Sequence, residues 1–173
     1  MTDIHFGTIK LIELSWILVP TGEAGCLIFA NLQDIRLIQF DSSDYTELVP
    51  GQRGAIALDY DFESGYIFWT DVINETISRA KMVENPKVDV LLKIDLDTPD
   101  GIAVDWVNKK LYWTDTGTDM IEVADFNGTN RLELITTGLE EPRAIVVHPA
   151  LGYVKLMCSL SILFAIDLTL FSV

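Results

Sequence analysis

Two tetrapeptides decide the fold of this chain, Phe68-Trp69-Thr70-Asp71 and Tyr112-Trp113-Thr114-Asp115. They lie 44 positions apart, and Ile77-Ser78-Arg79-Ala80 corresponds to Ile121-Glu122-Val123-Ala124 over the same interval. Self-similarity at a fixed period is the sequence signature of a repeat architecture. We therefore expect the chain to consist of copies of one structural unit.

A second motif precedes each tetrapeptide. Ile56-Ala57-Leu58-Asp59 matches Ile102-Ala103-Val104-Asp105, and a third copy stands at Ile145-Val146-Val147-His148. A degenerate leading copy is visible at Ile28-Phe29-Ala30-Asn31. This alignment predicts that Asp59 and Asp105 are equivalent, and that the chain holds about two and a half units.

Each unit indicates short strands rather than helices. The apolar runs at 102–105 and 111–114 are short, and a polar turn separates them. Asn127-Gly128 between two further runs favours a β-hairpin, because both residues tolerate positive φ. Four short strands in a period of roughly 40–45 residues are typical of a β-propeller blade. We predict an all-β, partial β-propeller with four-stranded antiparallel blades, in which strands 65–71 and 110–115 occupy equivalent places in neighbouring blades.

The tetrapeptides have a structural interpretation within such a blade. Their aromatic rings are expected to fill the wedge between neighbouring blades, and their threonines favour the strand. A buried carboxylate can bind adjacent backbone amides, which makes Asp71 and Asp115 structural rather than catalytic.

These residues resemble the class B (YWTD) repeats of the low-density lipoprotein receptor family, over about residues 26–154. The likeness is greatest to the start of the first propeller of the Wnt co-receptors in that family. It implies a six-bladed propeller that serves as an extracellular or cell-surface binding module of a membrane receptor. The implied partners are secreted protein ligands or short Asn-x-Ile peptide loops.

The resemblance also implies a ligand-binding face. Four residues match positions on that face: Val72, Glu75, Asp100 and Arg143. Leu32 and Gly117 depart from the family, which has Arg and Glu at those places. These two departures remove one donor and one acceptor from the expected surface.

Composition narrows the classes of function. The net charge of −14 at pH 7 argues against a nucleic-acid partner, because an acidic surface repels phosphates. Two cysteines and two histidines make neither a disulfide framework nor a metal site, so no metal or cofactor is expected. Asn74-Glu75-Thr76 and Asn127-Gly128-Thr129 are candidate glycosylation sites in predicted turns.

The two ends of the chain fall outside the repeat. Residues 1–25 contain an apolar run interrupted by Glu13, and are interpreted as a weak signal-like segment. Residues 155–173 form an apolar tail that contains Asp167. The alternatives for this tail are an artefact of truncation, a weak membrane segment or strands of an unusual edge blade.

Three functional interpretations follow. The favoured one is a receptor-type binding module with a role in Wnt signalling. A non-functional truncated fragment is the first alternative. The second is a propeller enzyme such as a lactonase, which would gather carboxylates and amides around a metal at the central channel. The aspartates here recur at structural positions instead, so an enzyme is not expected.

Overall fold

A computed structural model of the chain describes residues 16–21, 24–42, 45–149, 153–158 and 163–167. Within these ranges the regular elements are all β-strands. The same ranges contain no helix with the length and apolar character needed to span a membrane.

The described residues form fifteen strands in four antiparallel sheets, which we call blades 1 to 4. Blade 1 contains β1 (Trp16–Thr21), β2 (Ala24–Ala30), β3 (Ile35–Gln39) and β4 (Tyr45–Val49). Blade 2 contains β5 (Ala55–Asp61), β6 (Tyr66–Asp71), β7 (Thr76–Lys81) and β8 (Asp89–Leu92). Blade 3 contains β9 (Pro99–Asp105), β10 (Lys110–Asp115), β11 (Met120–Asp125) and β12 (Leu132–Ile135). Blade 4 contains β13 (Pro142–His148), β14 (Tyr153–Cys158) and β15 (Leu163–Asp167).

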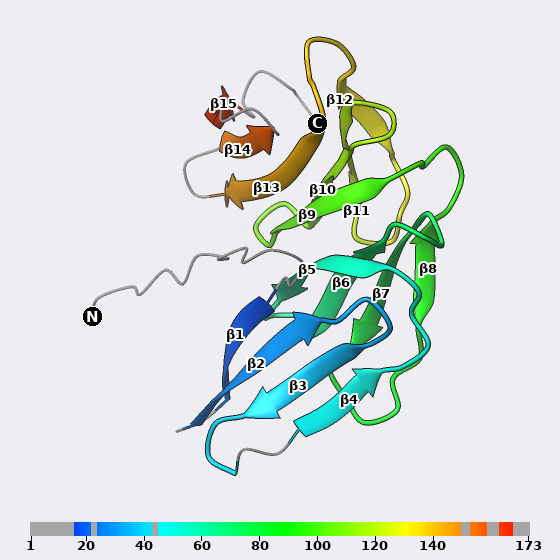
Figure 1. Ribbon diagram of the computed structural model, residues 1–173. Helices are drawn as coiled ribbons and strands as arrows, with labels where there is room; N and C mark the ends of the chain where they lie inside the picture. The colour runs from blue at the N-terminus through cyan, green and yellow to red at the C-terminus, as the bar shows by residue number, and fades with distance from the viewer. Residues whose placement is uncertain (1–15, 22–23, 43–44, 150–152, 159–162, 168–173) are drawn as a thin grey trace, which may run out of the picture.

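The blades are arranged as an arc (Figure 1). Strands follow chain order within each sheet, and the first strands of successive blades contact one another, β1 with β5, β5 with β9 and β9 with β13. The two motif strands, β6 and β10, are each the second strand of their own blade. This arrangement confirms the predicted fold class, a partial propeller with antiparallel four-stranded blades.

The number of blades exceeds the two and a half units that the sequence predicted. The described residues form three four-stranded sheets and one three-stranded sheet. Two strands contribute to the difference from outside the predicted bounds of the repeat. β1 comes from the segment expected to resemble a signal, and β15 comes from the apolar tail. Neither segment carries the tetrapeptide, so the repeat motif could not reveal them. The signal and membrane interpretations of these segments remain predictions, and part of each lies outside the described residues.

The strand register corrects one sequence equivalence. Asp105 pairs with Lys110, and the residue that pairs with Tyr66, 44 positions earlier, is Asp61 rather than Asp59. Asp61 is therefore the counterpart of Asp105, and Asp59 corresponds to Ala103. Side chains alternate with a period of two along a strand, so a shift of two residues keeps each one on its own face. The apolar pattern alone could not distinguish the two registers.

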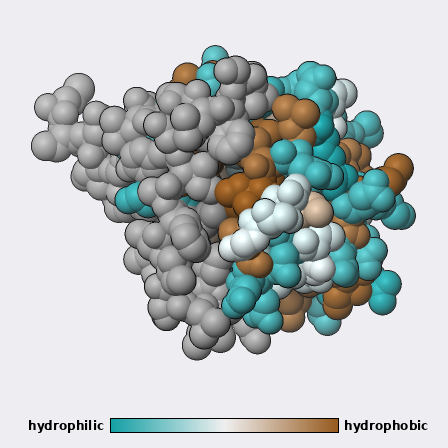
Figure 2. Space-filling view, turned by 90° about the horizontal axis from the view of Figure 1, so that it is seen from above, coloured by the Kyte–Doolittle hydropathy of each residue, from teal (hydrophilic) through white to brown (hydrophobic). Residues whose placement is uncertain are grey.

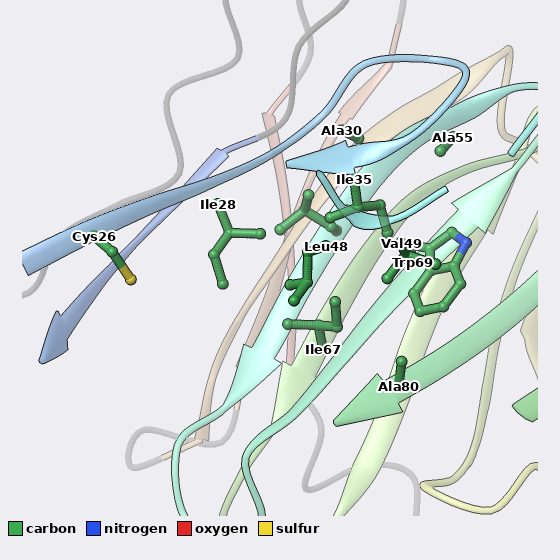
Figure 3. Close-up of a cluster of buried hydrophobic side chains, with 11 residues drawn as sticks. Cys26, Ile28, Ala30, Ile35, Leu48, Val49, Ala55, Ile67, Trp69 and Ala80 are labelled. Carbon is green, nitrogen blue, oxygen red and sulfur yellow. The ribbon is translucent and has the colours of Figure 1, made fainter. Parts of the chain in front are cut away.

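The core lies between the blades. Ile67 and Trp69 of β6 join a cluster with blade 1, whereas Phe68 from the same strand joins a cluster with blade 3. Figure 3 shows the first cluster, in which Trp69 lies among aliphatic side chains of both blades. In blade 3, Trp113 faces blade 2 and Tyr112 faces blade 4. Trp69, Trp113 and Phe68 are fully buried, which confirms that the motif rings fill the wedges between blades.

The motif threonines join each blade to the next. Thr70 Oγ1 donates to the carbonyl oxygen of Asp100 over 3.0 Å, and Thr114 Oγ1 donates to that of Arg143 over 2.6 Å. Both hydroxyls also accept a backbone N–H from the first strand of their own blade, from Ala57 and from Gly101 respectively. The threonine thus fixes where the following blade begins. This contact places Asp100 and Arg143 at one edge of the arc.

Candidate ligand-binding face

The candidate site lies on the edge of the arc where the motif strands end. β6 ends at Asp71 beside the start of β5, and β10 ends at Asp115 beside the start of β9. The loops after the motif strands and the loops before the first strands therefore emerge on the same side. We call this side the motif face. It is bounded by residues 50–54 and 72–75 in blade 2, by 93–98 and 116–119 in blade 3, and by 136–141 before blade 4.

A buried aspartate holds the two loops of each blade together. The Asp71 carboxylate accepts backbone N–H groups from Arg53 (3.0 Å), Ile73 (3.0 Å) and Asn74 (2.8 Å). Burial raises the pKa of Asp71, but these backbone donors outweigh it and hold the pKa below its ordinary value. In blade 3, Asp115 accepts the N–H groups of Asp97 and Thr98 from one loop, and those of Gly117 and Thr118 from the other. The face is therefore rigid at its base.

The structure brings two of the four predicted site residues into contact. Arg143 Nη1 donates to Asp100 Oδ2 over 3.1 Å, and Arg143 Nη2 donates to Glu141 Oε2 over 3.2 Å. Asp100 is buried, whereas the Arg143 side chain is 50% exposed. Thr116 Oγ1 also donates to Asp100 Oδ2, over 3.4 Å. The guanidinium is thus oriented by its neighbours and keeps an exposed side.

The other two predicted residues lie in the loop after β6. Val72 is half-buried, and its N–H donates to the carbonyl oxygen of Gly54. Glu75 is exposed and has a φ of 53°, in the left-handed region that non-glycine residues rarely adopt. Its counterpart in blade 3, Asp119, has a φ of 55°. The shared loop conformation holds Glu75 on the motif face in blade 2, whereas Asp100 belongs to blade 3 and Arg143 to blade 4.

Both departures from the family pattern are visible on this face. Leu32 is 43% exposed and makes an isolated bridge with Ala55 at the start of blade 2. Gly117 leaves room for a neighbouring acid, because a Cβ at that position would lie 2.4 Å from Asp97 Oδ2. The Asp97 carboxylate therefore occupies the space that a side chain at position 117 would take.

The two predicted glycosylation sites differ in their surroundings. Asn74 Nδ2 donates to the buried Asp71 Oδ2 over 2.9 Å. Asn108, which has no sequon, makes the same contact with Asp105 over 2.8 Å. Asn127 is exposed in the turn between β11 and β12, and its Oδ1 accepts from Thr129 N and Thr129 Oγ1.

Within the described ranges, no group of three or more His, Cys, Asp or Glu side chains has a geometry that could hold a metal ion. The aspartates of the repeat bind backbone amides instead.

Comparison with known proteins agrees with this geometry. The family model for low-density lipoprotein receptor repeat class B matches residues 65–106 and 109–149, which contain both motif strands. The chain belongs to the low-density lipoprotein receptor class B repeat family. The repeats place its propeller among the YWTD propellers, as the tetrapeptides indicated.

Three curated relatives are receptor-related proteins. The chain is 47% identical over 139 residues to low-density lipoprotein receptor-related protein 5 of Mus musculus, and 46% identical over 130 residues to that of Homo sapiens. It is 35% identical over 113 residues to low-density lipoprotein receptor-related protein 8 of Gallus gallus. The aligned regions cover 79%, 73% and 64% of this chain but only 9%, 8% and 12% of the relatives. The chain thus corresponds to a small segment of each.

Solved structures support the architecture. A chain in the crystal structure of a nidogen–laminin complex superposes with a TM-score of 0.71 at 30% identity, covering 76% of this chain and 52% of that one. Hydrazine synthase of Kuenenia stuttgartiensis superposes with a TM-score of 0.69 at 16% identity, covering 89% of this chain and 45% of that one. The second likeness concerns the fold alone.

Several residues of the motif face were not recognised from the sequence. They are Arg53, Ile73, Asp97, Thr116 and Glu141. The repeat pattern could have identified Arg53 and Asp97, because they lie 44 positions apart and precede equivalent strands. Glu141 carried no such signal, because its role depends on the path of the loop before β13.

Proposed function

We propose that this chain is an extracellular, receptor-type binding module that takes secreted protein ligands on its motif face. The observation that carries the proposal is the oriented pair Asp100–Arg143, which leaves a half-exposed guanidinium beside Glu141. Arginine held in this way presents planar N–H donors at low entropic cost. The similarity to receptor-related proteins supports the same class of function.

The ligand segment we propose is a short loop of the Asn-x-Ile type. An Asn side chain needs both a donor and an acceptor, and the motif face offers one of each in the Arg143 guanidinium at the start of blade 4 and the Glu75 carboxylate in blade 2. An Ile side chain needs an apolar contact, which half-buried Val72 offers. Loops on a rigid scaffold are the usual place for such recognition. We also propose a role in Wnt signalling and placement at the cell surface, and the likeness to receptor-related protein 5 supports the receptor class to which both belong.

The test is a titration of a fluorescent Asn-Ala-Ile peptide against the secreted chain. We expect the Glu75→Ala, Arg143→Ala double variant to bind at least about tenfold more weakly, because two charge-assisted hydrogen bonds are lost. The matched control is Glu84→Ala, Lys87→Ala, which removes one exposed charge of each sign from the opposite end of blade 2.

Two results would overturn the proposal: no binding by the wild-type chain, or equal affinity for the wild-type and the site variant. Arg143→Ala also leaves buried Asp100 without its charged partner, so thermal unfolding must be recorded for each variant. Glu75→Ala alone is the second variant, because the exposed Glu75 side chain makes no hydrogen bond or ion pair among the described residues.

A further inference from the structure

Two loops of the motif face carry opposite charges at equivalent positions. Arg53 N donates to Asp71 Oδ2 over 3.0 Å in blade 2, and Asp97 N donates to Asp115 Oδ2 over 2.9 Å in blade 3. The two backbones are therefore anchored in the same way, 44 positions apart. Both residues are exposed, and neither side chain makes a hydrogen bond or an ion pair within the part of the chain that the structure describes.

In each blade, a glycine in one of the two motif-face loops leaves space that a side chain of the other loop occupies. In blade 2, a Cβ on Gly54 would lie 2.8 Å from Ile73 Cγ1, so Ile73 occupies the space above that glycine. In blade 3 the relation is reversed, because the Asp97 carboxylate lies against Gly117, the counterpart of Ile73. Ile73 is 55% exposed. Blade 2 therefore offers a cation and an apolar side chain, and blade 3 offers an anion, on one face.

These charges differ from the one on Arg143. Both terminal nitrogens of Arg143 already donate to carboxylates of this chain, from Asp100 and Glu141. Among the described residues, Arg53 and Asp97 have no such partners, so no ion pair there offsets the attraction of each for a ligand. In the part of Figure 2 that is not grey, hydrophobic residues lie between hydrophilic ones. Discrimination between ligands is therefore expected to come from paired charges beside a single apolar contact.

We propose that Arg53, Ile73 and Asp97 set the specificity of the motif face, by selecting a peptide with an acidic side chain at one end and a basic one at the other. The apolar side chain of the peptide contacts Ile73 as well as the adjacent Val72, its acidic group pairs with Arg53, and its basic group pairs with Asp97. This inference rests on the proposed function, since it names the ligand that the same face takes. It also fixes the direction in which the peptide crosses blades 2 and 3.

The experiment compares two peptides of identical composition. One has the order Glu, Asn-Ala-Ile, Lys, and the other has Lys, Asn-Ala-Ile, Glu, with the same neutral spacers and blocked ends. We expect the wild-type chain to prefer one order by about tenfold, because only one order pairs both charges. The charge-swapped variant, Arg53→Asp with Asp97→Arg, keeps the net charge and is expected to prefer the other order.

Two further variants separate charge from packing. Gly117→Ala places a Cβ against the Asp97 carboxylate without changing any charge, and is expected to reduce the preference between the two peptides. Ile73→Ser is expected to weaken binding of both peptides equally. Glu84→Ala, at the opposite end of blade 2, is the control that should change neither quantity.

The outcomes distinguish this inference from the proposed function. If the wild-type chain binds neither peptide, the proposed function fails and the inference fails with it. If the wild-type chain binds both orders equally, or the charge-swapped variant keeps the wild-type preference, the specificity assignment alone is overturned. Thermal unfolding of the charge-swapped variant should match that of the wild type, because both side chains are exposed.

Discussion

At the scale of single residues, the buried aspartates after the motif tryptophans explain why the tetrapeptide is retained in both copies. Asp71 accepts three backbone N–H groups and the Nδ2 group of Asn74, and Asp115 accepts four backbone N–H groups. Only an ionised carboxylate can accept at both oxygens from so many donors. An amide would turn its own N–H groups toward the same donors.

We therefore expect Asp71→Asn to lower the free energy of unfolding by about 2–4 kcal/mol, because it leaves buried amides without an acceptor. Urea unfolding followed by the fluorescence of buried Trp69 and Trp113 measures the change. The control is Asp41→Asn at an exposed position, with an expected change within about 0.5 kcal/mol. Equal stability of the two variants would show that the Asp71 bonds do not hold the loops.

Asp59 gives a pH dependence of the opposite sign from Asp71. Burial raises the pKa of Asp59 to about 6, although Tyr60 N and Val104 N donate to its carboxylate at 2.8 and 2.7 Å. A carboxyl whose pKa is higher in the folded state stabilises the fold most below its unfolded value, near 3.8. That contribution is lost as the pH rises from about 4 through about 6.

We expect the free-energy difference between the wild type and Asp59→Asn to change by up to about 2–3 kcal/mol between pH 4 and pH 7, with the wild type relatively more stable at pH 4. Asn cannot titrate, so the difference isolates the Asp59 carboxyl from other groups. Chemical unfolding of both proteins at four pH values measures it. A constant difference over this range would mean that Asp59 titrates normally in the folded chain.

At the scale of strands and turns, local sequence predicted the position of a turn correctly, whereas it did not predict the register in which two strands pair. Asn127-Gly128 lies in the turn between β11 and β12, as the sequence indicated, with Gly128 at a φ of 81°. Pairing was harder to predict, because Asp59 and Asp61 point to the same face of β5 and both precede the motif strand. Only the ladder partners, Phe68 for Asp59 and Tyr66 for Asp61, resolved the equivalence with Asp105.

The same turns lead to a prediction about modification. We propose that Asn127 is glycosylated in the secreted chain and that Asn74 is not, because Asn74 Nδ2 is bound to buried Asp71 whereas the Asn127 side chain is exposed. Mass spectrometry of tryptic glycopeptides measures occupancy at each site, and Asn127→Gln should remove the whole mass shift. A glycan on Asn74, or an unmodified Asn127, would contradict this assignment.

At the scale of the whole molecule, the sequence predicted the architecture but not its extent. The aromatic motif specified blades 2 and 3 because large rings are needed where two sheets pack at an angle. Blade 1 has Phe29, Ala30 and Asn31 where blades 2 and 3 have Trp, Thr and Asp. Its two edge strands, β1 and β4, were not recognised from the sequence. The motif face was only partly predicted, since the Asp100–Arg143 contact joins residues 43 positions apart across two blades.

The interfaces between blades also determine what loss of the last residues should do. The described core clusters join blade 1 to 2, blade 2 to 3 and blade 3 to 4 separately. Val154 of β14 belongs to the third cluster and is 1% exposed. Stability in stacked repeats is approximately a sum of the individual units and the interfaces between neighbours. Removal of residues 155–173 should therefore weaken blade 4 and leave the other two interfaces intact.

We expect a chain ending at Val154 to keep its β-sheet circular dichroism and to melt only a few degrees below the full chain. Thr114 Oγ1 still holds Arg143, and Ile145 still packs on blade 3, so β13 keeps its place without β14. Val154→Ala in the full chain is the matched variant, because it removes one buried contact but keeps every strand pair. If truncation lowered the melting temperature by more than about 10 °C while Val154→Ala did not, the pairing of β14 and β15 would be a principal support of the arc rather than an addition to it.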